Sequence, residues 1–213
     1  MVKLFAHRGF TQNKFPQNSI LSLKNAIDHG YQAIEFDIWY FQDELLLSHD
    51  MPKDNPQALP RFADYLTYGN NIEYWIDFKN LDLHNIYQVI AKIRQDFQSQ
   101  SINLEKIFFA PFITDYKLAI KIWNIFYEFF GREINVVGVC DNSAQLPQII
   151  DFLNHRAINY VSIFHELIDQ YLIQNIDSNC ILAWTVNNDS RLRKLATWGI
   201  NKFATDDITP RDI

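Results

Sequence analysis

The sequence of 213 residues contains only two cysteines, Cys140 and Cys180, which are isolated from each other and form no metal-binding pair. Two free thiols in a reducing compartment are the simplest interpretation, and a single disulfide is the alternative. The chain also lacks any run of about twenty apolar residues, and its first seven residues include one base and little apolar sequence. We therefore predict a cytoplasmic protein with neither a signal peptide nor a transmembrane segment.

A positively charged stretch is missing as well. The chain has 25 acidic and 19 basic residues, a net charge of −6, and no basic run. This balance excludes nucleic-acid binding through a positive face. Hydrophobic residues make up 48% of the sequence, which is enough for one sizeable core. Because no linker or low-complexity segment interrupts the chain, we expect residues 1–213 to form a single domain. Nothing in the sequence indicates the oligomeric state.

Short apolar strands alternate with amphipathic helices along the whole chain. The predicted strands are 3–6, 33–39, 74–79, 106–110, 135–139, 159–163, 181–186 and 202–205. The predicted helices are 20–27, 61–68, 83–97, 116–130, 144–153, 166–174 and 190–198, and residues 45–47 are a short extended piece. Eight such units predict a compact (β/α)8 TIM barrel with a nearly absent final helix. A doubly wound open sheet is the alternative, but no glycine-rich phosphate turn follows the first strand.

Two acidic residues stand out in the second predicted strand. Glu35 and Asp37 are two residues apart, so both carboxylates project from the same face of the strand. Neighbouring carboxylates repel each other unless positive charge lies between them. The sequence therefore indicates either a divalent cation or a basic cluster at this point.

Further polar residues follow other predicted strands. His7 and Arg8 end the first strand, Asp77 and Lys79 end the third, and His49 comes shortly after residues 45–47. In a TIM barrel the active site lies at the carboxyl ends of the strands, so we expect all of these side chains to meet at one rim. Three carboxylates without a thiolate favour Mg²⁺ or Ca²⁺, and Zn²⁺ is an alternative if a histidine joins them.

This set of residues suits phosphodiester cleavage. A bound cation together with Arg8 and Lys79 gives a positive floor for a phosphate. His7 and His49 can then act as base and acid, and Trp184 near the end of the seventh strand can contact the leaving group.

Taken singly, each of these residues also has a plainer interpretation. His49 is a solvated loop residue, Glu35 pairs with Lys79 in a structural salt bridge, and Trp184 is packing. The aromatic stretch 118–130 is a barrel helix with one face on the sheet, or else an exposed patch for lipid or a second subunit. The candidate site therefore depends on the set rather than on any one member.

Several motifs, in this order, resemble the glycerophosphodiester phosphodiesterase family. They are residues 6–9 (AHRG), 16–18 (PQN), 35–37 (EFD), 49–50 (HD), 183–187 (AWTVN) and 199–206 (GINKFATD). The resemblance implies a TIM-type barrel, a small-molecule phosphodiester substrate and a divalent cation, usually Ca²⁺ or Mg²⁺. It implies the following roles: His7 and His49 as the acid–base pair, Arg8 and Lys79 on the phosphate, and Glu35, Asp37 and Asp77 as metal ligands.

The chain departs from the family's pattern at three points. Gln17 and Asp77 stand where the family has glutamate, and only residues 51–59 separate the HD motif from the next predicted helix. The small cap that the family inserts there is therefore expected to be missing, which leaves the site more open. Related functions stay open as alternatives: a sphingomyelinase D-like enzyme acting on lipid headgroups, a non-catalytic phospholigand-binding barrel, and a metal-dependent sugar isomerase or aldolase.

Overall fold

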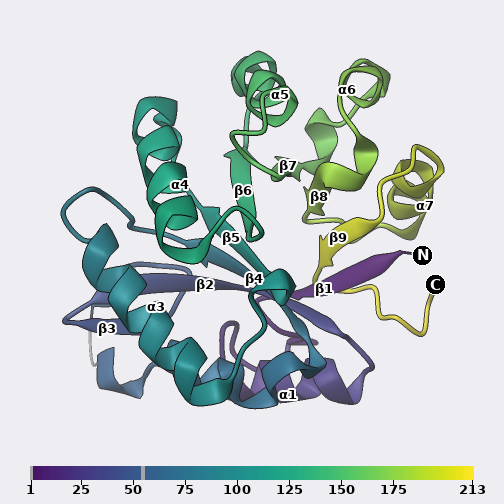
Figure 1. The fold of residues 1–213 in the computed structure, drawn as a ribbon. Helices are drawn as coiled ribbons and strands as arrows, with labels where there is room; N and C mark the ends of the chain where they lie inside the picture. Colours follow the sequence, from purple (N-terminus) through teal and green to yellow (C-terminus); the bar gives the residue numbers. More distant parts are fainter. Residues whose placement is uncertain (1, 54–55) are drawn as a thin grey trace.

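The computed structural model describes residues 2–53 and 56–213 and arranges eight parallel strands in a closed barrel (Figure 1). The barrel strands are β1 (Lys3–His7), β2 (Ala33–Phe41), β4 (Glu73–Phe78), β5 (Ile107–Pro111), β6 (Asn135–Cys140), β7 (Tyr160–Phe164), β8 (Ile181–Trp184) and β9 (Lys202–Thr205). Because β1 pairs with both β2 and β9, the sheet has no free edge within the barrel. The predicted (β/α)8 TIM barrel is confirmed.

Helices cover the outside of this barrel. The α-helices are α1 (Ile20–Asp28), α2 (Phe62–Tyr65), α3 (Ile86–Gln100), α4 (Tyr116–Phe130), α5 (Leu146–Asn154), α6 (Gln170–Asn175) and α7 (Asp189–Thr197). The short 3₁₀ helices are η1 (Pro56–Ala58), η2 (Leu66–Asn71), η3 (Leu104–Lys106), η4 (Ser143–Gln145), η5 (His165–Leu167) and η6 (Ser178–Cys180). No α-helix follows β9 in residues 206–213, in agreement with the prediction. In the part of the chain that is described, every helix is too short or too polar to cross a bilayer.

A β-hairpin interrupts the regular alternation. β3 (Glu44–Leu47) pairs antiparallel with the end of β2, through a turn in which Gln42 and Asp43 have φ of 51° and 62°. Two consecutive positive φ values are the mark of a tight hairpin turn. The backbone N–H of Ser48 then donates to the carbonyl of Asp37. The hairpin therefore returns the chain to the level of Asp37, and His49 follows there.

Two apolar layers hold these elements together. Outside the sheet, α4 turns Ala119, Ile122 and Trp123 into the core, so the aromatic stretch of this helix mainly packs on the barrel. Inside the barrel, an apolar cluster that includes Phe5 and Trp75 fills the space below the carboxyl ends of the strands. A TIM barrel interior is a packed core rather than a pore, so polar chemistry is confined to the mouth.

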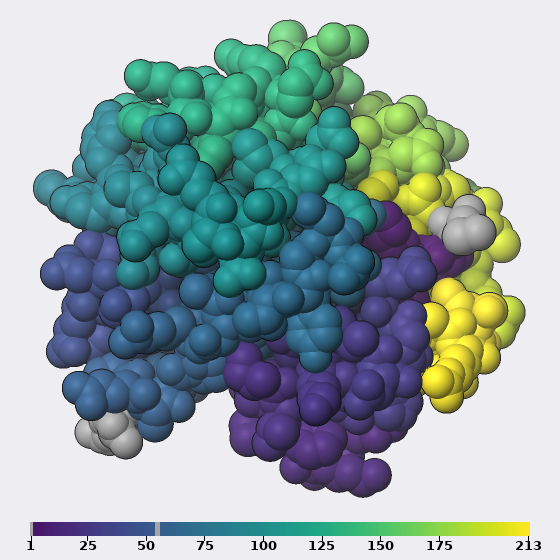
Figure 2. Space-filling view, turned by 60° about the horizontal axis from the view of Figure 1, so that its bottom comes forward, coloured from purple at the N-terminus to yellow at the C-terminus, as the bar shows by residue number. Residues whose placement is uncertain are grey.

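The start and the end of the chain lie side by side. Figure 2 shows the yellow C-terminal residues against the purple N-terminal ones, as the pairing of β1 with β9 requires. Both cysteines are free thiols, which favours the first of the two interpretations given above. Between His49 and α2, the described residues 50–53 and 56–61 contain only the short helix η1. These residues form no cap over the mouth, as expected.

Candidate active site

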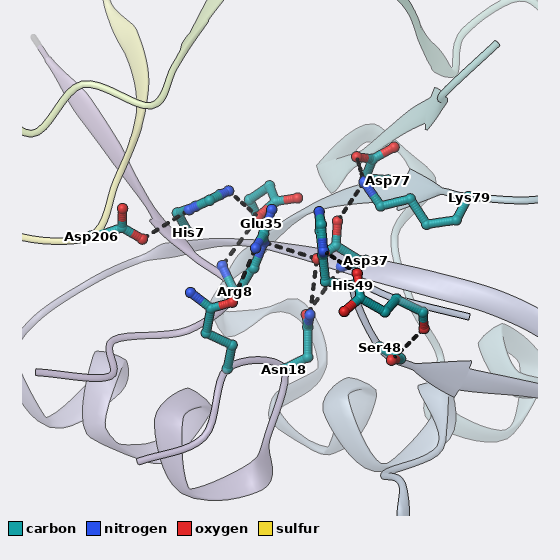
Figure 3. A network of polar contacts seen from close by, with 12 residues as sticks. His7, Arg8, Asn18, Glu35, Asp37, Ser48, His49, Asp77, Lys79 and Asp206 are labelled. Carbon is teal, nitrogen blue, oxygen red and sulfur yellow. Dashed lines mark hydrogen bonds and ion pairs between the residues drawn. The ribbon is translucent and has the colours of Figure 1, made fainter. Parts of the chain in front are cut away.

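The carboxyl ends of β1, β2 and β4 bring the polar side chains together (Figure 3). In the strand register His7 lies beside Glu35, and Asp37 lies beside Asp77, so these side chains share the inner face of the barrel. All of the predicted site residues line one cavity of about 260 Å³. They are His7, Arg8, Glu35, Asp37, His49, Asp77, Lys79 and Trp184.

Three carboxylates form the acidic side of this cavity. Glu35, Asp37 and Asp77 each place an oxygen within 4.8 Å of the other two. Burial and the charge of Asp37 raise the pKa of Glu35 to about 8, and burial and Asp37 raise the pKa of Asp77 to about 6 against the effect of Lys79. Oδ1 of Asp77 is buried without a hydrogen-bond partner among the described residues. A hard cation with oxygen ligands fits this donor set, because it would neutralise the repulsion and take up the unpartnered oxygen.

Asp37 lies between two positively charged side chains. Arg8 Nε lies 3.0 Å from its Oδ2, and Lys79 Nζ lies 2.8 Å from its Oδ1. Burial on its own would raise the pKa of Asp37, but Lys79 and Arg8 outweigh it and hold this pKa below its usual value. Asp37 is therefore ionised even without a bound cation.

Lys79 connects two of the acids. Its Nζ donates to Oδ2 of Asp77 at 2.6 Å as well as pairing with Asp37, and these two charges raise its pKa although burial alone would lower it. The ring of Phe112 lies 4.9 Å from the same nitrogen. The predicted structural salt bridge between Glu35 and Lys79 is therefore wrong: among the residues described, the partners of Lys79 are Asp37 and Asp77.

Asn18 has a role that the sequence did not reveal. Its Nδ2 donates to Asp37 Oδ2 at 2.9 Å, and its Oδ1 accepts from the backbone N–H of Asp37 at 3.1 Å. The next residue, Ser19, accepts a hydrogen bond from Ser22 N and caps α1. Asn18 thus fixes Asp37 instead, and its only signal in the sequence was its place in the PQN motif.

His7 is held by Asp206, which follows β9, the strand next to β1. Its Nδ1 lies 2.8 Å from Asp206 Oδ1, and Asn187 Nδ2 donates to the other oxygen of Asp206 at 2.8 Å. The second ring nitrogen of His7, Nε2, lies 3.7 Å from Glu35 Oε2. Burial lowers the pKa of His7, but Glu35 and Asp206 outweigh it and the pKa is raised overall. Asp206 therefore orients His7 so that Nε2 faces the cavity.

His49 and Arg8 occupy the outer part of the cavity. The side chain of His49 is 46% exposed, and its Nδ1 lies 2.9 Å from Oδ1 of the neighbouring Asp50. Arg8 Nη1 donates to Gln17 Oε1 at 3.0 Å. The Gln17 departure therefore contacts the guanidinium directly, and it leaves Arg8 with one anionic neighbour fewer than a glutamate would provide.

The opposite side of the cavity has a different character. We call it the β5–β8 wall, and its members are Ala110, Phe112, Val139, Ser162 and Trp184. It contributes no charged side chain among the described residues. The mouth of the barrel thus has a charged half, which can bind an anion, and a largely apolar half, which can contact an organic group.

Comparison with known proteins identifies the class of this site. Residues 7–125, more than half of the chain, match the family model of the glycerophosphoryl diester phosphodiesterase family. The chain therefore belongs to this family and is a phosphoric diester hydrolase. The matched segment includes both candidate histidines and all three carboxylates, and it ends before Trp184 and Asp206.

Individual relatives agree with this assignment. A glycerophosphodiester phosphodiesterase from Bacillus altitudinis is 20% identical over 248 residues, which cover 97% of this chain and 95% of that protein. A phosphodiesterase from Oleispira antarctica, solved with the product sn-glycerol-3-phosphate, has a TM-score of 0.75 at 17% identity, covering 96% of this chain and 92% of its own. A glycerophosphodiester phosphodiesterase from Parabacteroides distasonis has a TM-score of 0.74 at 17% identity, with coverages of 96% and 92%. These structures share the fold of this chain.

Proposed function

We propose that this enzyme hydrolyses glycerol-type phosphodiesters with the help of a divalent cation, and that His7 and His49 are its acid–base pair. The observation that carries the proposal is the meeting of three carboxylates, two permanent cations and two imidazoles around one cavity. A site that only bound an anion would gain nothing from three buried carboxylates, because they repel it.

Glu35, Asp37 and Asp77 would hold the cation. Their oxygens suit Mg²⁺ or Ca²⁺, and the unpartnered Oδ1 of Asp77 offers a ready ligand. When bound, the cation would stabilise the negative charge that develops on the phosphoryl oxygens. Arg8 and Lys79 would bind the remaining phosphate oxygens, since both lie at the edge of the acidic cluster and keep their positive charges there.

The histidines would move the protons. One imidazole takes the proton of a substrate hydroxyl next to the phosphoester, and the oxygen of that hydroxyl attacks phosphorus. The bond from phosphorus to the leaving alcohol breaks, and the other imidazole protonates that alcohol. Water then opens the resulting cyclic phosphate with the two roles exchanged. The bond between His7 Nδ1 and Asp206 supports a role for His7, because it leaves Nε2 directed at the cavity.

The open mouth of the barrel leaves room for one alcohol group of the substrate to extend into solvent. Trp184 on the β5–β8 wall would contact an alcohol group of the ester. Since residues 50–53 and 56–61 form no cap, the rest of the substrate extends toward solvent. An open mouth accommodates a soluble glycerophosphodiester and equally a lipid with a similar headgroup, so the assay must include both.

The test compares histidine variants on a panel of phosphodiesters. We expect His7→Ala and His49→Ala each to lose at least a hundredfold in kcat with Mg²⁺ or Ca²⁺ present, because general acid–base catalysis contributes about that much. His155→Ala is the matched control, since its Nδ1 bonds to a backbone carbonyl on α5, away from the cavity. Near-normal rates in either site variant would remove the acid–base assignment. Turnover in excess chelator would contradict a role for the cation. Binding of a phosphodiester without any turnover would favour the phospholigand-binding alternative.

A further inference from the structure

One polar side chain in the apolar half of the cavity is not explained by the charged site. Ser162 lies in β7, is 4% exposed, and lines the cavity. Its neighbour in the strand ladder is Leu182, which belongs to the packed interior of the barrel. Ser162 is therefore the point at which the apolar interior gives way to the cavity on this side.

No hydrogen bond joins the hydroxyl of Ser162 to the residues that the structure describes, and its Oγ is not one of the fully buried unpartnered atoms, so this hydroxyl is open to the cavity. Thr205 shows the contrast: it is fully buried, and its hydroxyl donates to Asn187 Oδ1 at 3.2 Å. A hydroxyl that is unpaired within the protein and open to a cavity can both donate a hydrogen bond to a bound molecule and accept one from it.

A second unpaired group lies on the same wall. Trp184 follows Leu182 by two residues, so its side chain is on the same face as that of Ser162, one step closer to the mouth. Its Nε1 is buried without a hydrogen-bond partner among the described residues. An open hydroxyl and a tryptophan whose N–H is unpaired therefore lie together on a wall whose other members are apolar.

We propose that Ser162 is a specificity-determining residue that binds a hydroxyl group on the alcohol part of the substrate, with Trp184 beside it. This inference rests on the proposed phosphodiesterase function. A substrate hydroxyl can donate to Ser162 and accept from it, whereas an ammonium group can only donate. An ammonium would also meet the positive charge of Lys79, whose Nζ lies 4.9 Å from the ring of Phe112 on this wall. The wall is thus suited to a neutral, hydroxyl-bearing group.

The experiment uses two esters that differ by one hydroxyl. The first is a glycerol phosphodiester, and the second is the matching 1,2-propanediol phosphodiester. The second ester keeps the hydroxyl beside the phosphoester that attacks phosphorus and lacks only the terminal one. The ratio of kcat/KM for the two esters is measured in the wild-type protein, in Ser162→Ala and in Ser99→Ala. Ser99 is the matched control, because its hydroxyl donates to the carbonyl of Asp96 within α3.

We expect the wild-type protein and Ser99→Ala to prefer the glycerol ester by about tenfold, the effect of one hydrogen bond, and Ser162→Ala to lose that preference. Because the ratio does not depend on how much protein is folded, partial misfolding of the variant leaves the test intact. An unchanged preference in Ser162→Ala, or equal rates for both esters in an active wild-type protein, overturns the role of Ser162 alone. A wild-type protein that cleaves neither ester overturns the proposed function and this inference with it.

Discussion

Replacing Asp77 by asparagine should stabilise the metal-free protein. The carboxyl is buried beside Glu35 and Asp37, and its pKa is raised from 3.8 to about 6. A raised pKa of an acid means that the folded state resists its ionisation, so the folded protein is less stable wherever the group is charged. Asparagine keeps an oxygen for Lys79 but carries no charge.

The size of the gain follows from the pKa. A shift of this size corresponds to about 3 kcal/mol at pH 8. The attraction of Lys79 is already included in this pKa, and asparagine resembles the neutral acid, so about 3 kcal/mol is the whole expected gain. Below the pKa of the unfolded chain the acid is neutral in both states and costs nothing. At pH 5 only the unfolded chain is largely ionised, so the gain should be about half as large.

The assay is urea unfolding in the presence of chelator and in saturating Mg²⁺ or Ca²⁺. In the presence of chelator, Asp77→Asn should be more stable than the wild-type protein. A ligand at a thousand times its Kd stabilises a folded protein by about 4.1 kcal/mol, so the cation should reverse this order if Asp77 is one of its ligands. Asp50→Asn serves as a control, because the side chain of Asp50 is 90% exposed and should affect neither measurement.

Two results would refute this reasoning. If Asp77→Asn is less stable than the wild-type protein in chelator at pH 8, the carboxylates do not repel each other as their burial indicates. If the order of stability is the same with and without the cation, Asp77 is not one of its ligands.

Three further substitutions test other parts of the site. Asp206→Asn should lower kcat at least tenfold with little change in KM, because a neutral amide replaces the carboxylate that orients His7; an unchanged kcat, or a rise in KM as large as the fall in kcat, would contradict this. Asn18→Gly should reduce the free energy of unfolding by about 2 kcal/mol in urea, since Asp37 loses two hydrogen bonds and glycine adopts φ of 53° without strain; a change under 0.5 kcal/mol would show that water replaces the amide. Gly9→Ala should cost about 3 kcal/mol in thermal unfolding, because φ is +79° and a Cβ would lie 2.8 Å from the backbone of α1; an unchanged Tm would contradict this.

The periodic features of the chain were predictable from its sequence. Alternation in β2 placed Glu35 and Asp37 on one face, and the structure buries both on the inner side of the barrel. The alternation of strands and helices was enough to predict the barrel, because a helical connection between two parallel strands is almost always right-handed. Convergence of Asp77 with these acids then followed from neighbouring strands.

Contacts between distant segments were not predictable. Asp206 reaches His7 only because β9 lies next to β1, and 199 residues separate the two. Asn18 is a residue type that favours helix caps, but its partner Asp37 is 19 residues away along the chain. From the sequence, Lys79 could pair with any of three acids, and the folded structure pairs it with Asp37 and Asp77. Sequence periodicity fixes which face a side chain takes, and tertiary packing chooses its partner.

The two halves of the barrel mouth come from different parts of the chain. Except for Asp206, the charged half comes from residues 7–79, and the β5–β8 wall comes from residues 110–184. Mutation in the later strands can therefore change which alcohol is accepted while the machinery that handles phosphorus stays intact. Evolution of new substrate ranges, or their engineering by exchange of β6 to β8 between relatives, should follow this boundary.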